Sequence, residues 1–141
     1  MTELTLALSN TILNAALAQA GAQGYRPMSA VVLDAGGHLV AMQRQDGATM
    51  FRTEIATGKA WAAVAMGVSS RALGKRAADN PNFFAALAST GQGKFIPQVG
   101  AVLIKNGAGV VLGAVGASGG TGDEDEAICI HGVEAAGLKA D

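Results

Sequence analysis

LGAVGASGGTGDEDEA, residues 112–127, is the stretch from which the fold and a possible site can both be inferred. Its apolar first part predicts a strand, and the four acids Asp123–Glu126 predict the start of a helix. Glycines let backbone amides approach a ligand closely, and a helix N-terminus presents unpaired N–H groups with a positive dipole end. We therefore expect a ligand to contact the residues that join strand to helix, Gly119, Gly120, Thr121 and Gly122.

The same residues also have a purely structural interpretation. Thr121 and Glu124 match the capping box T-x-x-E, in which each side chain bonds a backbone amide of the other residue. Acids in the first turn of a helix stabilise its dipole without any ligand. Both interpretations stay open at this point.

Length and composition indicate one soluble domain, residues 1–141. Half of the residues are apolar and only 15% are charged, whereas about 25% is typical of soluble domains. Some of the surface should therefore be apolar, and an interface between copies is the simplest use for it. We predict a homo-oligomer.

The distribution of charged and apolar residues argues against nucleic acid and a membrane as partners. The net charge is −1 and the ten basic residues are scattered, which does not favour nucleic acid. No secretory signal is recognisable, and the longest apolar run, 60–68, is too short to span a bilayer. These features predict a cytoplasmic protein without a membrane partner. The single cysteine, Cys129, excludes an internal disulfide and is expected to be buried.

Periodicity and turn signals predict the element order α-β-β-α-α-β-β-α. The Asp34–Gly37 and Asn106–Gly107 turns each indicate a hairpin, and no βαβ unit is recognisable. The pattern indicates an α+β fold, an antiparallel sheet flanked by helices. In chain order, the expected helices are 3–22, 50–69, 71–77 with a short restart at 80–87, and 122–136, and the expected strands are 30–33, 38–44, 99–104 and 110–116. Small residues, Ala56, Ala60, Val64 and Gly67, give the helix 50–69 a smooth face that is suited to lying closely on a sheet.

Candidate functional residues are charged side chains near glycine-rich turns. Arg44 and Asp46 end the second strand, while Arg52 and Lys59, seven residues apart, share one face of the following helix. Arginine and lysine in a pocket would favour a ligand that bears a carboxylate. In an enzyme, Lys59 and Arg44 would bind that carboxylate and Asp125 or Glu124 would move a proton.

Histidine is scarce in this chain. His131 lies in the last predicted helix, seven residues after Glu124 and on the same face, and it is the first candidate metal ligand. His38 follows the first hairpin turn and is expected to be exposed. No Ser-His-Asp set, H-E-x-x-H pattern or Walker loop is present.

Three motifs together resemble one known family. VVLDAGGHLVAMQRQDGA at 31–48, KAWAAV at 59–64 and GAVGASGGTGDEDEA at 113–127 are similar to the GlcG/HbpS-like (DUF336) family, which also forms the C-terminal domain of PduO adenosyltransferases. The resemblance implies a profilin-like α+β sandwich with a five-stranded antiparallel sheet. It also implies dimers to octamers and the binding of haem or a corrinoid. Since the periodicity gives four strands, the stretch 95–97 is the expected fifth.

The resemblance does not supply an iron ligand. Some haem-binding relatives use a histidine of the first helix, and residues 2–20 contain none. Ligand chemistry leaves His131, His38, Met28 and Met50 as substitutes.

Two functions are thus compatible with the sequence. The first is a tetrapyrrole-binding protein, with haem as cofactor, that acts as a carrier, sensor or accessory in haem handling. The alternative is a cofactor-free tautomerase, hydratase or lyase that acts on a small carboxylate.

Overall fold

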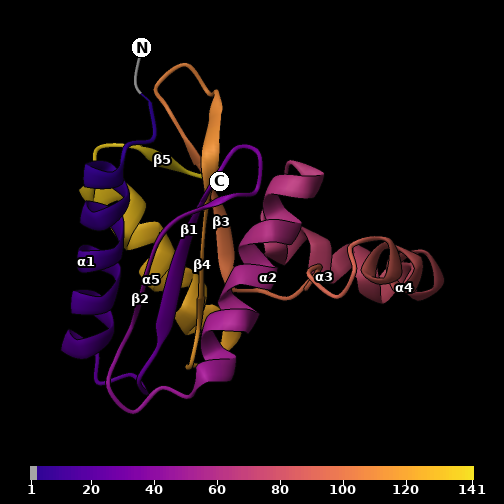
Figure 1. The fold of residues 1–141 in the computed structure, drawn as a ribbon, viewed down its shortest axis with the longest axis horizontal. Helices are drawn as coiled ribbons and strands as arrows, with labels where there is room; N and C mark the ends of the chain where they lie inside the picture. Colours follow the sequence, from indigo (N-terminus) through magenta and orange to yellow (C-terminus); the bar gives the residue numbers. More distant parts are fainter. Residues whose placement is uncertain (1–2) are drawn as a thin grey trace.

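The computed structural model describes residues 3–141, which form an α+β fold with a five-stranded antiparallel sheet (Figure 1). The predicted element order is confirmed, with a third helix between the two hairpins and one short strand added after the last helix. The helices are α1 Leu6–Ala22, α2 Met50–Met66, α3 Ser70–Asp79, α4 Pro81–Thr90 and α5 Gly122–Ala135. The strands are β1 Ser29–Asp34, β2 Leu39–Arg44, β3 Ala101–Lys105, β4 Val111–Ser118 and β5 Lys139–Ala140.

The strands lie in the order β2-β1-β4-β3-β5, and every neighbouring pair is antiparallel. Both predicted hairpins, β1–β2 and β3–β4, are present. In the first turn, the Asp34 carboxylate accepts hydrogen bonds from the amides of Gly36 and His38, at 2.9 and 3.0 Å. An Asp side chain that bonds the backbone two residues ahead stabilises a tight turn, which explains why this sequence folds back here.

The fifth strand is not where the sequence suggested. Residues 95–97 form a loop, in which the Ile96 amide donates to the Gly58 carbonyl at 3.2 Å. The edge strand is instead β5, which pairs with β3 through Ile104 and Lys105. Two residues are too few to produce a visible alternation of polar and apolar side chains, so this strand has no periodic signal.

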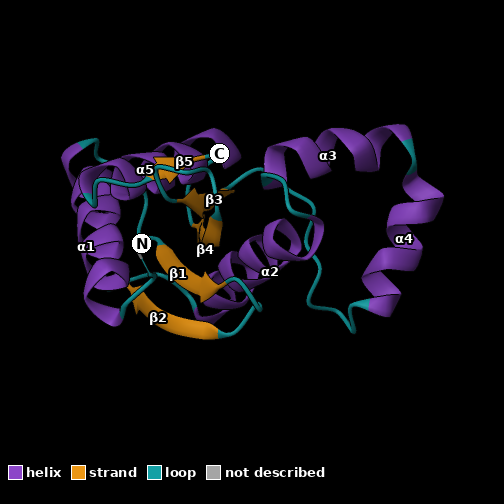
Figure 2. Cartoon of the chain, turned by 90° about the horizontal axis from the view of Figure 1, so that it is seen from above, coloured by secondary structure: helices purple, strands orange, loops and turns teal. Residues whose placement is uncertain are grey.

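Helices cover both faces of the sheet (Figure 2). On one face, α1 and α5 pack against alternate strand residues such as Ala30, Val32 and Val115. On the other face, α2 packs against Val31 and Leu33 of the same strand. Because side chains of a strand alternate between faces, the continuous apolar run of β1 is buried on both sides.

The small-residue face predicted for α2 lies directly on the sheet. Ala56 and Ala60 are fully buried there, and Gly116 of β4 lies under the Ala56 carbonyl with no room for a side chain. The sequence predicts Gly67 on the same face, but Gly67 is instead the exposed residue that ends the helix, at φ +71°. Its left-handed conformation explains why glycine occurs there.

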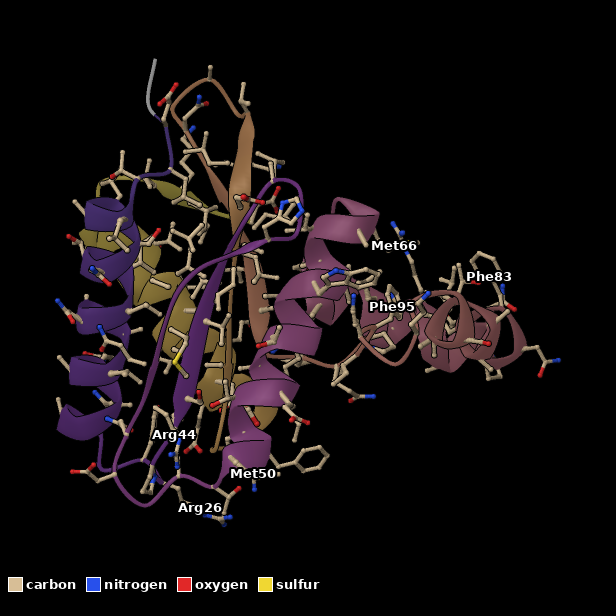
Figure 3. The ribbon with its side chains drawn as sticks, viewed as in Figure 1. Arg26, Arg44, Met50, Met66, Phe83 and Phe95 are labelled. Carbon is tan, nitrogen blue, oxygen red and sulfur yellow. The ribbon has the colours of Figure 1, made fainter. Side chains whose placement is uncertain are left out.

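Helices α3 and α4 extend away from the sandwich (Figure 3). They are held by a small aromatic cluster, in which Phe95 contacts Trp61 and Phe84 at ring-centroid distances of 6.4 and 6.1 Å. Phe83 remains exposed on this part of the molecule. Within residues 3–141, no helix combines the length and apolar character needed to cross a membrane.

Candidate functional site

Lys59 of α2 and Asp125 of α5 form a buried ion pair across the end of β4. The Lys59 Nζ lies 3.0 Å from Asp125 Oδ2 and donates a second hydrogen bond to the Ala117 carbonyl at 3.1 Å. Asp125 Oδ1 accepts from the Gly120 amide at 2.9 Å. The pair therefore joins α2, the end of β4, the glycine loop and α5 at one point.

Burial dominates the electrostatics of Asp125. Loss of hydration raises the pKa of its carboxyl, while the Lys59 charge, the bonds from Lys59 and Gly120, and the Arg52 charge oppose the rise. The net direction is upward from the ordinary value of 3.8. A buried carboxyl with a raised pKa and a specific cationic partner in a cleft is typical of functional sites.

The pair lies at a cleft of about 460 Å³ between α2, the loop before β3 and the start of α5. A volume of this size suits a small organic molecule. Its polar lining includes Arg52, Gln98, Ser118 and Thr121, and its apolar lining consists of Ile55, Ile96 and Val99. The structure thus brings together six of the predicted residues: Arg52, Lys59, Gly120, Thr121, Gly122 and Asp125.

Gly119, the remaining residue of the predicted loop, does not line this cleft. It is buried, with φ +150°, and its Cα lies against the backbone of Pro27 and Met28, where a side chain would collide. A glycine is therefore required for the chain to pass from β4 to α5 at this point.

Glu124 serves the helix and not the cleft. Thr121 Oγ1 accepts from the Glu124 amide at 3.2 Å, and Glu124 Oε1 accepts from the Thr121 amide at 2.9 Å. This reciprocal pair is the capping box that the sequence predicted. Because its carboxylate is engaged there, the structure gives no support to Glu124 as a proton-transfer group.

Arg44 and Asp46 lie in a different cleft, of about 660 Å³, next to α1. Figure 3 labels Arg44. Arg44 donates to the Ala48 carbonyl at 2.6 Å. This cleft shares no lining residue with the cleft of Lys59. The structure therefore does not bring Arg44 and Lys59 together around one carboxylate, as the sequence suggested. Arg44 and Ser118 lie at the same end of the sheet, each level with Ser29, but the cleft of Arg44 is lined by α1 and that of Lys59 by α2. Sequence proximity to a glycine turn could not tell which helix each residue faces.

The candidate iron ligands are dispersed. His131 is exposed on α5 and lines none of the clefts that contain Arg44, Lys59 or His38. Met28 is fully buried in the core, while Met50 is 72% exposed at the start of α2. His38 lines a third cleft, of about 480 Å³, beside the two hairpin turns. Among residues 3–141, no three His, Cys, Asp or Glu side chains converge as a metal-binding group.

Cys129 is buried, as the sequence predicted. Loss of hydration strongly raises the pKa of its thiol, and its Sγ donates to the Gly100 carbonyl at 3.6 Å. A buried thiol with a raised pKa is unreactive, so Cys129 has a packing role.

Sequence reasoning missed Ser118, Gln98 and the three apolar residues of the Lys59 cleft. Ile96 and Val99 lie in the irregular segment before β3, where no periodicity predicts an orientation. The only available signal was that Ile55 falls between Arg52 and Lys59 on one helix, at spacings of three and four.

Comparisons with known proteins agree with this architecture. Residues 4–134 match the family described as haem degrading protein HbpS-like, and the chain belongs to that family. The crystal structure of the PduOC–haem complex is 26% identical, with a TM-score of 0.86 over 97% of each chain. A double mutant of HbpS from Streptomyces reticuli is 27% identical, with a TM-score of 0.81 over 95% of this chain and 87% of that one.

A further structure shares the fold. The Klebsiella pneumoniae protein ORFY, of family DUF336, is 24% identical, with a TM-score of 0.87 over 97% of this chain and 93% of that chain. No curated protein matches the chain by sequence.

Proposed function

We propose that this protein binds haem and acts as a carrier, sensor or accessory in haem handling. The observation that carries the proposal is its likeness to the PduOC–haem complex along 97% of both chains, at 26% identity. Membership of the HbpS-like family supports the same ligand. A bound haem would supply a redox-active iron to this protein.

The cleft at His38 has the chemistry that haem requires, namely an iron ligand beside an apolar surface. Its apolar lining is formed by Leu4, Val110, Val111 and Leu112. The His38 side chain is 82% exposed, so it is accessible to a ligand. The Lys59 cleft, in contrast, contains no histidine, methionine, cysteine or tyrosine.

The Asp34 carboxylate lies beside the His38 ring. Its Oδ1 lies 3.4 Å from His38 Nδ1 and accepts the His38 and Gly36 amides. These amide bonds, together with the adjacent imidazole, lower the pKa of the Asp34 carboxyl. Metal-binding histidines commonly have a carboxylate at the second ring nitrogen, which fixes the ring and raises its basicity. Nε2 of His38 is therefore the atom that we assign to iron.

A haemin titration tests both the function and the ligand. We expect wild-type protein to give a saturable Soret shift at one equivalent per chain or per pair of chains. His38→Ala should abolish the shift, and Asp34→Asn should weaken haemin binding by about 10- to 100-fold. His131→Ala is the matched control, since it removes the other histidine, and it should leave the titration unchanged.

The outcomes distinguish a failure of the proposed haem binding from a failure of the His38 ligand assignment. A linear, unsaturable increase in wild-type absorbance would show that this protein does not bind haem specifically. A saturable shift that persists in His38→Ala would leave haem binding intact and refute the ligand assignment. Loss of the shift in His131→Ala alone would move the iron to α5.

We also propose that copies of the chain associate. Large apolar side chains are exposed on β2, on α2 and in the β3–β4 turn, among them Leu39, Met50, Phe51 and Val110. Burial of such groups is the usual driving force for association. Light scattering should show a mass above that of one chain, and a single-chain mass at micromolar concentration would refute association.

A further inference from the structure

We propose that the cleft over the Lys59–Asp125 pair binds a small monocarboxylate, separately from any haem. Its carboxylate would lie between Arg52 and the first turn of α5, and its apolar body would lie against Ile55, Ile96 and Val99. One side of this cleft is polar and the other is apolar, and both line the same small cavity.

Arg52 supplies the positive charge of this site. Its Nη1 lies 3.5 Å from Ser118 Oγ, and among residues 3–141 no carboxylate forms an ion pair with it. The residue is only partly exposed and lines the cleft. A planar guanidinium without a partner fits a carboxylate through two parallel hydrogen bonds.

Further donors surround the same space. Lys59 uses two of its three N–H groups on Ala117 and Asp125, which leaves one hydrogen for a ligand. The Thr121 hydroxyl accepts from the Glu124 amide, so its own hydrogen is free to donate. Gly122 is the first residue of α5, where backbone amides lack acceptors within the helix.

The acids of the cleft limit the charge of its ligand. Asp125 offsets the Lys59 charge, and Asp123, which also lines the cleft, pairs with Arg71. One uncompensated cation therefore remains, that of Arg52. A single negative charge matches it, whereas a phosphate dianion would bring one more negative charge than Arg52 can offset.

The floor of the cleft is fixed before any ligand binds. Lys59 extends into the space that a side chain at residue 100 would need, because a Cβ on Gly100 would lie 2.6 Å from its Nζ. Its bonds to Ala117 and Asp125 then hold the ammonium in place. A site that needs no rearrangement loses less entropy on binding.

The test uses isobutyrate, its uncharged isostere isobutyramide, and inorganic phosphate as probes. Nuclear magnetic resonance titrations of the 15N-labelled protein would follow the amides of Gly120 and Gly122. We expect saturable shifts with isobutyrate, none with isobutyramide, and weaker binding of phosphate. Arg52→Gln should weaken isobutyrate binding by about tenfold or more. The affinity of Arg52→Lys for isobutyrate should lie between those of Arg52→Gln and wild type.

Arg76→Gln is the matched control, since Arg76 is exposed on α3 and lines none of the clefts described. It should bind isobutyrate as wild type does. Equal binding of isobutyramide, tighter binding of phosphate, unchanged affinity in Arg52→Gln, or no saturable wild-type shift would each overturn the proposal. The His38 cleft shares no residue with this one. His38→Ala should therefore bind isobutyrate as wild type does, and Arg52→Gln should show the wild-type Soret shift with haemin.

Discussion

The Lys59 ammonium and the Asp125 carboxylate lie 3.0 Å apart, with the two residues only 5% and 2% exposed. They come from helices on opposite faces of the sheet, α2 and α5, and meet beyond the end of β4. A pair so placed stabilises the junction of three elements and at the same time forms the floor of a cleft.

Removal of one partner should strongly destabilise the protein. Lys59→Met leaves a buried carboxylate without its counter-charge, which costs about 3–5 kcal/mol for pairs of this kind. Lys105→Met is the control, because Lys105 pairs with the exposed Asp141 at the surface, where such pairs contribute about 0–1 kcal/mol. Urea unfolding measures both. Equal losses in the two variants would contradict a stabilising role for the buried pair.

The free energy of unfolding should depend on pH through the ionisation of Asp125. Because the folded pKa of Asp125 is raised, the native state holds this proton more tightly than the unfolded chain does. Stability should therefore fall as the pH rises from 3.8 through the folded pKa. Asp125→Asn lacks this ionisation, so the stability of wild type relative to this variant should decrease over that window. An increase over the same window would show that the attraction of Lys59 outweighs burial.

Gly116→Ala should destabilise the packing of α2 on the sheet. Its new methyl group would collide with the Ala56 carbonyl and crowd Ala60, both of which belong to helix α2. Overpacking of a tight core costs about 1–3 kcal/mol, and backbone on the opposing side cannot rotate away. Gly107→Ala, in the β3–β4 turn, meets nothing within 4 Å and is the control. Thermal unfolding should show a lower Tm for the first variant only.

The capping box can be tested by its effect on stability. Thr121→Ala removes the acceptor for the Glu124 amide and should cost about 0.5–2 kcal/mol. Glu124→Gln keeps an oxygen for the Thr121 amide, so its unfolding free energy should stay near that of wild type. If Glu124→Gln abolished isobutyrate binding while stability held, Glu124 would have a role in the site beyond the cap.

Local chemistry in the sequence was sufficient for most of the fold. The Asp34 turn, the Asn106 turn and the small-residue face of α2 are short-range signals, and each predicted the element that the structure contains. Two candidate residues were also linked locally, since a helix places Arg52 and Lys59 on one side. The cap at Thr121 is likewise a four-residue property.

Only the tertiary structure decided which of these groups meet. Lys59 and Asp125 are 66 residues apart, and no periodicity relates a helix on one face of a sheet to a helix on the other. The same limitation explains the separation of Arg44 from Lys59 and the place of β5 at the sheet edge. Sequence patterns fix how each segment buries its apolar side, because that depends on neighbours along the chain. Which charged side chains share a cleft depends on how the packed layers are registered in space.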